Sequence, residues 1–393
     1  MFILIPKQPF LSWAVHEHKP MQKAREYYID NIRIALTALV ILHHTAITYG
    51  GPGGWYYSEP ADGLVSGLLL TIFVSTNQAF FMGFFFLLSS YFIPASYVRK
   101  GSYRFLLERL KRLGIPIVFY SLVITPVMIY MLVRLKMNEP ISWYAVFIDR
   151  DEWINIGVLW FTAALLLFTI VYAASRSLVP AKVNNPKSLP GNLTIFLFGL
   201  GLGLISFVVR LVFPIGWTLD PVGFQFAHFP QYIALFTVGL WAYPNQWLSS
   251  VSYAQGKFWL RIALLLIVVG FPCIYLLKVV THSELDAFLG GLTIQSFVNS
   301  LWEQLLGISL IMAWLGIARQ KWNDQGPATK EFSRSAYAVY IIHPLVLLLV
   351  SLLLKDVHLS SLLKFLLTGS IAVSLSFAVG SLLVRVPVVK DIV

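Results

Sequence analysis

The sequence predicts an all-α, polytopic membrane protein with about ten transmembrane helices. Of its 393 residues, 58% are hydrophobic and only 12% are charged, whereas soluble domains carry about 25% charged residues. Apolar runs of membrane-crossing length, about 20 residues, recur along the whole chain. Lys and Arg gather in alternate connecting segments, as expected of a helical membrane protein.

The apolar runs form ten segments. They lie near residues 30–49, 65–95, 113–135, 158–175, 192–213, 227–244, 257–280, 292–318, 334–354 and 359–385. The second run is long for one crossing. We therefore expect it to include a helix outside the bilayer or a kink around Ser75–Gln78.

The distribution of cations predicts the orientation. With the N-terminus inside, 21 of the 29 Lys and Arg residues fall in inside segments, seven fall in outside segments and their flanks, and Arg33 lies within the first apolar segment. This asymmetry predicts that both termini are cytoplasmic. The protein is expected in the inner or plasma membrane. The expected organisation is a cytoplasmic segment 1–29, a transmembrane domain 30–385 and a cytoplasmic tail 386–393. The net charge of +11 then reflects topology, and no nucleic-acid partner is expected.

The outer segments 50–63 and 141–153 are aromatic and acidic. One interpretation is a belt of Trp and Tyr at the membrane interface. The other is a platform for a carbohydrate, because aromatic faces beside carboxylates suit a polyhydroxyl ligand.

The first apolar segment carries a cation and two imidazoles, and ionisable groups inside a membrane helix are costly and mark functional sites. Arg33 and His44 are eleven residues apart, which places them within about 20° on one helix face and about 16 Å apart along the axis. His43 points about 100° away. Histidine is the natural general base for a hydroxyl that attacks an acyl group. His44 is the expected base, with His43 as its competitor.

A basic run, residues 103–112, precedes the third segment on the cytoplasmic side. Arg109 and Arg112 are three residues apart and share a helix face. They either bind anionic lipid or clamp a phosphorylated ligand, because guanidinium groups match phosphate oxygens.

Glu303 is the one acid within a late segment. We expect it to assist His44 or the acceptor, with an outward-facing, solvated carboxylate as the alternative. Asp30 is three residues from Arg33 and is expected to pair with it. His228 and His343 are either structural or part of the site. No metal is expected, because His43 and His44 point to different faces and the single cysteine, Cys273, lies in an apolar run.

Several segments resemble the acyltransferase 3 family of membrane acyltransferases. The spacing of Arg33 and His44 matches its Arg-x10-His motif, and Arg109-x-x-Arg112 matches its Arg-x-x-Arg motif. Further similar segments are Asp30–Arg33, Phe84–Phe92 (with Ser90 where the family has glycine), Leu159–Phe161 and Ser335–Pro344. Segments 47–57 and 229–232 are most similar to the branch with the succinyltransferase of osmoregulated periplasmic glucans.

The resemblance implies that residues 30–385 form an acyltransferase domain. It implies a membrane O-acyltransferase that uses cytosolic acyl-CoA, with acetyl-CoA expected first and succinyl-CoA as the alternative. Arg109 and Arg112 would bind its phosphates, Arg33 its thioester end or pantetheine arm, and His44 would deprotonate a hydroxyl of an envelope glycan. No Gly-x-Ser-x-Gly elbow is present, which favours direct transfer.

The rival hypotheses are a transporter or flippase for a sugar or lipid-linked sugar, whose pathway would also be lined by buried polar residues, and a scaffold without activity. The bilayer is an expected partner under each of them. The oligomeric state stays open.

Overall fold

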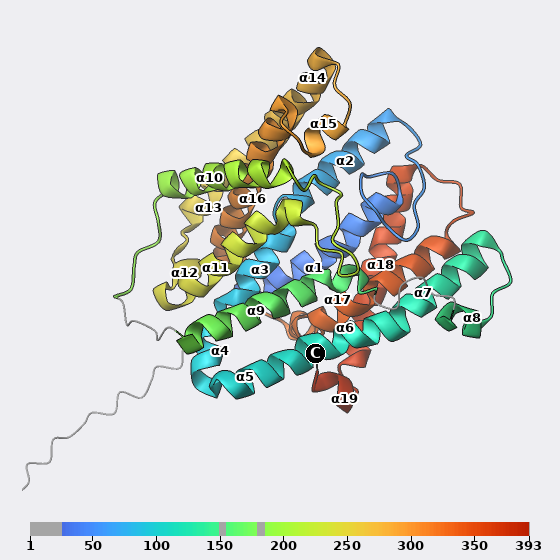
Figure 1. The fold of residues 1–393 in the computed structure, drawn as a ribbon, viewed down its shortest axis with the longest axis horizontal. Coiled ribbons are helices and arrows are strands. Elements are labelled where there is room, and N and C mark those ends of the chain that lie inside the picture. Colours follow the sequence, from blue (N-terminus) through green and yellow to red (C-terminus); the bar gives the residue numbers. More distant parts are fainter. Residues whose placement is uncertain (1–25, 149–154, 179–184, 393) are drawn as a thin grey trace, which may run out of the picture.

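The computed structural model describes residues 26–148, 155–178 and 185–392. Within these ranges the chain forms helices and loops, with one isolated bridge between Leu219 and Phe224 (Figure 1). The membrane-length helices are α1 (Tyr27–Thr48), α9 (Trp160–Leu178), α10 (Asn192–Arg210), α16 (Ile294–Lys321), α17 (Pro327–Leu353) and α18 (Ser361–Leu383). Three further helical stretches, Leu64–Lys100, Ser102–Met137 and Tyr253–Thr281, consist of several elements each.

These three stretches are interrupted helices. The first contains α2 (Leu64–Gln78), α3 (Phe81–Tyr91) and α4 (Ile93–Lys100); the second contains α5 (Ser102–Arg109), α6 (Ile115–Phe119) and α7 (Thr125–Met131); the third contains α13 (Tyr253–Leu265) and α14 (Phe271–Thr281). The shorter helix α11 spans Phe229–Asn245. Small helices are α8 (Trp143–Ile148), α12 (Trp247–Ser250), α15 (Asp286–Leu289) and α19 (Pro387–Lys390).

Each of the ten predicted segments coincides with a helix. In the part of the chain that the structure describes, nine helical stretches are long and apolar enough to cross a membrane, so this is a multi-pass membrane protein. The tenth predicted segment is α11, which has 17 residues and a length of about 25 Å. Because α11 begins beside the cavity that contains His44 and ends beside the cavity that contains Arg109, it runs the length of the bundle like its neighbours.

The bundle has two distinct ends. We call the end that carries segment 49–63 the Trp55 end; segments 211–225 and 282–293 lie at the same end. The opposite end carries Arg109 and Arg112, and we call it the arginine end. The start of α1 and the C-terminal residues Lys390–Ile392 both lie at the arginine end, as an even number of crossings requires.

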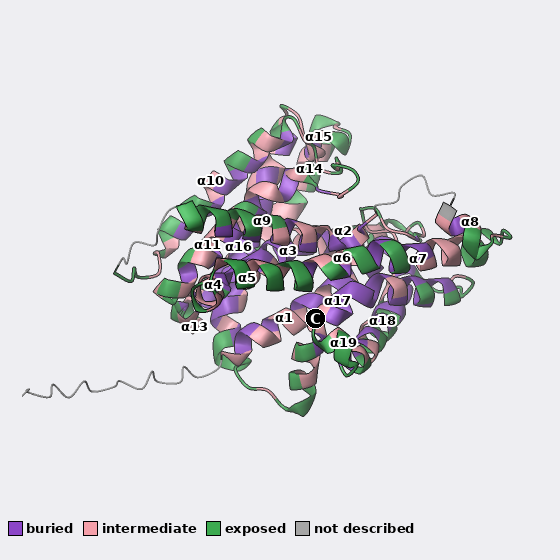
Figure 2. Ribbon diagram, turned by 60° about the horizontal axis from the view of Figure 1, so that its bottom comes forward, coloured by how far each residue is buried: buried purple, intermediate pink, exposed green. Residues whose placement is uncertain are grey.

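Helix α1 is the centre of the bundle. It contacts α2, α3, α16, α17 and α18, and Figure 2 shows its residues as buried or intermediate. Residues on several of its sides are buried, including Ile32, Leu36, Val40 and Ile41. A helix that is apolar nearly all round belongs inside a bundle, so Arg33 and His44 are held by neighbours rather than by lipid.

The exposed face of the bundle is apolar. Along α13 and α14, large side chains that include Leu264, Val268 and Leu276 are half or more exposed. So extensive an apolar surface is uncommon on a soluble monomer and fits contact with lipid chains.

The expected kink in the second segment is confirmed. Helix α2 ends at Gln78, and α3 begins at Phe81. The Ala79 carbonyl in the break accepts a hydrogen bond of 2.8 Å from Gln231 Nε2 on α11. Gly307 of α16 permits this close approach, because a Cβ atom there would lie 2.0 Å from the Ala79 oxygen.

Prolines explain three π-turns, at Leu110–Gly114, Tyr120–Ile124 and Leu266–Gly270. Each is followed directly by a helix with proline in its second position, at Pro116, Pro126 and Pro272. Proline lacks the N–H for the usual i to i−4 bond, and its ring displaces the carbonyl of the preceding turn. The helix therefore widens locally and continues.

Candidate active site

A cavity of about 590 Å³ opens at the Trp55 end between α1, α2, α3, α11 and α16. Its polar lining residues include His43, His44, Gln78, His228, Asn299 and Glu303. Its aromatic lining residues include Phe81, Trp160, Tyr232, Trp302 and Tyr340. We call this space the histidine cavity. Its size is in the range of small-molecule sites, and its combination of apolar walls with a few polar groups is typical of them.

His44 lines this cavity and also stacks on aromatic rings. Its ring lies 3.8 Å from the Trp55 ring, centroid to centroid, with 17° between the planes. On α17, the His343 ring lies 5.6 Å away at 18°. Trp55 comes from segment 50–63, which the sequence analysis predicts to lie outside, and this half-buried residue packs on His44.

Polar contacts hold the segment that carries Trp55. The Glu59 N–H donates to the Thr48 carbonyl at 2.7 Å, and the Glu59 carboxylate pairs with Lys364 Nζ on α18 at 2.7 Å. The Asp62 N–H donates to Ser361 Oγ at 2.9 Å, and the Ser66 hydroxyl, which bonds to the Asp62 carboxylate, lowers the pKa of that group. The segment is thereby fixed to α1 and α18, with Trp55 against His44.

Several nitrogen atoms around His44 are buried without a hydrogen-bond partner among the described residues. They are His44 Nδ1, His43 Nδ1, His343 Nε2 and Trp55 Nε1. Such groups are rare in proteins and call for an explanation. One nitrogen of His343 is satisfied, because Nδ1 lies 2.7 Å from the Tyr340 carbonyl. A carbonyl only accepts, so Nδ1 carries the proton and Nε2 keeps its lone pair.

His43 packs on a different side of α1, as the helical spacing predicts. Its ring lies 4.8 Å from Phe81 and 5.5 Å from His44, at 80° to the latter. Because both histidines line the histidine cavity, His43 stays a competitor for the role of base.

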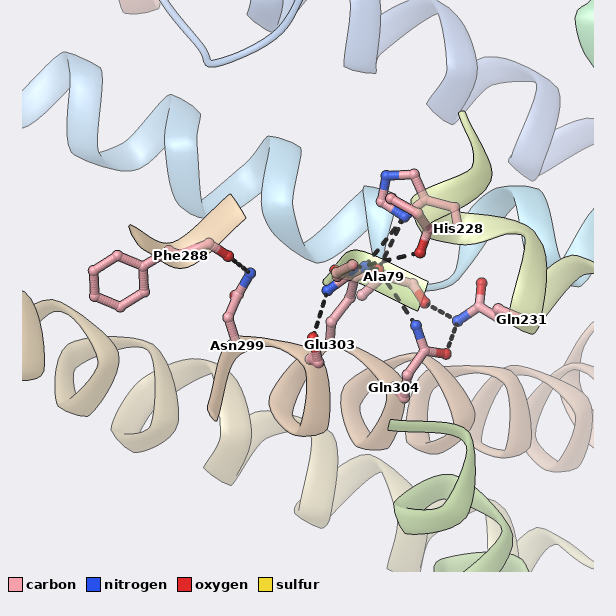
Figure 3. A network of polar contacts seen from close by, with 10 residues as sticks. Ala79, His228, Gln231, Phe288, Asn299, Glu303 and Gln304 are labelled. Atoms are coloured by element: carbon pink, nitrogen blue, oxygen red, sulfur yellow. Dashed lines mark hydrogen bonds and ion pairs between the residues drawn. The ribbon is translucent and has the colours of Figure 1, made fainter. Parts of the chain in front are cut away.

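Glu303 has partners other than the expected His44. Its two oxygens lie 2.9 and 2.8 Å from Arg210 Nη2, and Oε1 lies 3.1 Å from His228 Nδ1 (Figure 3). Its expected role beside His44 or the acceptor stays a prediction, whereas the expectation of a solvated carboxylate is wrong, because Glu303 is buried. Burial explains why Glu303 pairs with Arg210, because a carboxylate inside the bundle needs a cation. Glu303 nevertheless lines the same cavity as His44.

Arg210 is the residue that the sequence analysis does not single out. There it is one of the seven cations of the predicted outside segments and their flanks. It is completely buried at the end of α10, and it also donates to Ser300 Oγ at 3.1 Å and to the Ala227 carbonyl at 3.4 Å. A signal was present, because a single Arg and a single Glu in two otherwise uncharged segments are expected to neutralise each other.

The buried pair leads to a prediction about stability. Glu303→Gln leaves Arg210 buried without a counter-charge, and breaking such pairs costs about 3–5 kcal/mol. We expect a marked fall in the unfolding temperature of the purified protein in detergent. The double variant Arg210→Met/Glu303→Leu removes both charges and should recover most of that loss. An unchanged midpoint for Glu303→Gln would contradict the ion pair.

The predicted arginines meet at the other end of α1. Arg33, Arg109 and Arg112 line one cavity of about 330 Å³, which we call the arginine cavity. Arg33 bonds to Asp30 at 3.3 Å, as expected, and to the Leu88 carbonyl at 3.1 Å. The Arg112 guanidinium lies over the Tyr337 ring at 5.9 Å.

The arginine cavity continues toward solvent. A second space of about 620 Å³ shares Phe92, Arg109 and Arg112 with it and adds Arg99, Lys100 and Lys111. The C-terminal residues Lys390, Asp391 and Ile392 form part of its wall. The arginine end thus offers a cationic entrance that narrows toward α1.

Tyr340 separates the two ends. It is the one residue that lines both the arginine cavity and the histidine cavity, among those that the structure describes. Its hydroxyl donates to the Val158 carbonyl, and Val158 also lines the histidine cavity. A ligand that enters among the arginines is therefore separated from the His44 cavity at Tyr340.

The family model of the acyltransferase 3 domain matches residues 26–385. The chain belongs to the acyltransferase 3 family. Curated relatives include glucans biosynthesis protein C of Escherichia coli strain SMS-3-5, which is 24% identical over 94% of both chains. The protein of the same name from Salmonella gallinarum is 27% identical over 48% of this chain and 51% of its own length. The chain thus spans about half the length of some relatives and nearly all of others. No solved structure matches significantly.

The segments that resemble the acyltransferase 3 family have structural roles. Ser90 stands where the family has glycine, and it faces Gly239 of α11, where a Cβ atom would lie 1.9 Å from Ser90 Oγ. A glycine on one of these two helices is enough for α3 and α11 to pack closely. Ser335–Pro344 forms the part of α17 that includes Tyr337, Tyr340 and His343.

The outer segment 141–153 is described only in part. Trp143 and Tyr144 on α8 are exposed and do not line the histidine cavity, as interfacial residues would be. Asp149, Asp151, Glu152 and Trp153 lie outside the described residues, as does the N-terminal segment 1–25.

Proposed function

We propose that this chain is a membrane O-acyltransferase that transfers an acyl group from cytosolic acyl-CoA to a hydroxyl of a cell-envelope carbohydrate. One observation carries the proposal: an acyltransferase 3 domain places a cationic cavity and a histidine-lined cavity at opposite ends of one bundle, with Tyr340 between them. Acetyl-CoA is the donor we expect first, and succinyl-CoA is the alternative.

The arginine end is the proposed donor site and faces the cytoplasm. The excess of Lys and Arg in the segments of this end supports that orientation. Arg109 and Arg112 offer planar guanidinium groups for the phosphates of CoA. Arg33 lies at the inner part of the same cavity, where it would contact the pantetheine arm or the thioester.

The histidine cavity is the proposed acceptor site. When the Tyr340 side chain moves aside and the thioester end reaches the histidine cavity, His44 removes the proton of the acceptor hydroxyl as the hydroxyl oxygen attacks the thioester carbonyl carbon. The carbon–sulfur bond breaks, the acyl group forms an ester with the acceptor oxygen, and the sulfur leaves as CoA thiol after it takes up a proton. Trp55 stacks on the His44 ring, and the His343 ring lies near both of them. The names of the relatives support a glucan as acceptor.

The proposal is tested by consumption of labelled acetyl-CoA and succinyl-CoA by the purified protein, with glucan oligosaccharides as acceptors. We expect one donor to be consumed and an acylated oligosaccharide to form. Folded protein that neither binds nor consumes either thioester would remove the proposal and favour transport of a sugar. Thermal shifts with CoA and with dephospho-CoA separate the two functions further, because a transporter has no need to recognise the 3′-phosphate.

The separation of the cavities leads to a second prediction. Tyr340→Ala joins the two cavities, so water and thioester should meet without an acceptor. We expect hydrolysis of the donor to rise several-fold when no acceptor is added. Tyr337→Ala, which enlarges only the arginine cavity, serves as the matched control. Equal hydrolysis by wild type and Tyr340→Ala would show that Tyr340 is not the barrier.

A further inference from the structure

His228 is held in one orientation by a buried carboxylate. Glu303 Oε1 lies 3.1 Å from His228 Nδ1, whereas Arg210 Nη2 lies 3.5 Å from the same nitrogen. A carboxylate only accepts hydrogen bonds, so the shorter contact requires the proton on Nδ1. In the tautomer with its proton on Nδ1, the lone pair is on Nε2. This is the arrangement by which a carboxylate fixes the tautomer of a catalytic histidine.

The ion pair of Arg210 and Glu303 carries no net charge that could attract a charged ligand. Arg210 is completely buried and contacts both oxygens of Glu303, and its other hydrogen bonds go to Ser300 and Ala227. The Glu303 carboxylate is therefore already neutralised. On this wall of the cavity, the group that remains available to a ligand is the hydrogen-bond acceptor of His228. It binds a ligand group that donates a hydrogen bond.

The surroundings of His228 fit a neutral polyhydroxyl molecule. His228 precedes α11 and lines the histidine cavity together with Gln225 and Asn299. Trp160 stacks on the buried ring of Tyr232 at 5.5 Å within the same lining, and Trp160, which is only half-buried, provides aromatic surface in the cavity that His228 lines. Amphipathic aromatic rings with a few convergent polar groups are suited to a sugar.

We propose that His228 binds the acceptor by accepting a hydrogen bond at Nε2 from a hydroxyl other than the one that is acylated. The bond selects an acceptor with at least two hydroxyls and determines which of them reaches His44. Arg210 and Glu303 are positioning residues that keep His228 in the accepting tautomer. The inference rests on the proposed function, since it assigns a substrate class to the same cavity.

The test compares acyl transfer to methyl glucoside and to its monodeoxy analogues, each of which lacks one hydroxyl. Wild type, His228→Phe and His228→Gln are measured with the donor that wild type consumes. His358→Phe, at an exposed position outside the cavity lining, is the matched control. The KM of acceptor and donor and the apparent unfolding temperature are determined for each variant.

We expect His228→Phe to raise the acceptor KM about tenfold, the worth of one hydrogen bond, with the donor KM unchanged. Wild type should acylate one deoxy analogue more poorly than methyl glucoside. His228→Phe should acylate that analogue and methyl glucoside equally well. His228→Gln, whose amide oxygen also accepts, should retain part of the discrimination. A merely structural role for His228 would change the unfolding temperature and leave the pattern among the analogues intact.

The outcomes separate the two proposals. If wild type acylates the glucoside and His228→Phe shows the same penalty for every analogue, the role of His228 is refuted while the acyltransferase proposal stands. If wild type consumes a thioester but acylates none of the glucosides, the sugar assignment of the cavity fails. If wild type consumes no thioester, both proposals fail.

Discussion

His44→Ala is expected to abolish acyl transfer. Removing a general base lowers kcat by about a thousandfold, because the acceptor hydroxyl must then lose its proton without help. Donor binding should persist, since the arginines that would hold CoA line a different cavity. The measurement is the rate of ester formation with saturating thioester, together with the thermal shift caused by CoA.

One control variant distinguishes the two neighbouring histidines. His43→Ala removes the neighbouring imidazole, which lines the same cavity but packs on Phe81 rather than on Trp55. We expect it to reduce the rate far less than His44→Ala does. If His43→Ala eliminates transfer and His44→Ala retains it, His43 is the base. If a correctly folded His44→Ala protein transfers at the wild-type rate, the assignment of His44 is wrong.

The second large effect is expected on the donor. Arg109→Ala/Arg112→Ala removes two guanidinium groups from the entrance and from the arginine cavity. Hydrogen bonds between charged partners contribute about 1.5–3 kcal/mol each, and about 1.4 kcal/mol corresponds to a factor of ten. We therefore expect the KM for acyl-CoA to rise at least about a hundredfold, with a much smaller effect on the KM for the acceptor.

Charge and geometry are separated by two further variants. Arg109→Lys/Arg112→Lys keeps the charge but loses the planar, two-pronged contact with phosphate, and it should recover only part of the donor affinity. Arg104→Ala changes an exposed cation on α5 that does not line either cavity, and it should leave the donor KM as in wild type. Equal effects of Arg104→Ala and the double variant would indicate a general electrostatic contribution in place of a binding site.

Much of this protein was determined by the sequence itself. The ten apolar segments and the kink after Gln78 follow from the length of the runs and from the polar residues within them. The placement of Arg33 and His44 on one face of α1 follows from the period of the helix. The ion pair of Arg33 with Asp30 follows for the same reason. Each of these features depends on a single stretch of the sequence, and local geometry fixes it before any helix packs.

The tertiary structure decided what lies opposite each of those residues. The pairing of Glu303 with Arg210, 93 residues away, depends on how α10 and α16 pack. The stack of Trp55 on His44 depends on the return of segment 49–63 over the end of α1. Tyr340 separates the two cavities only because α17 lies beside α1. The physical reason is that a buried charge or ring must find its partner across helix contacts, and sequence spacing specifies neighbours only along a single helix.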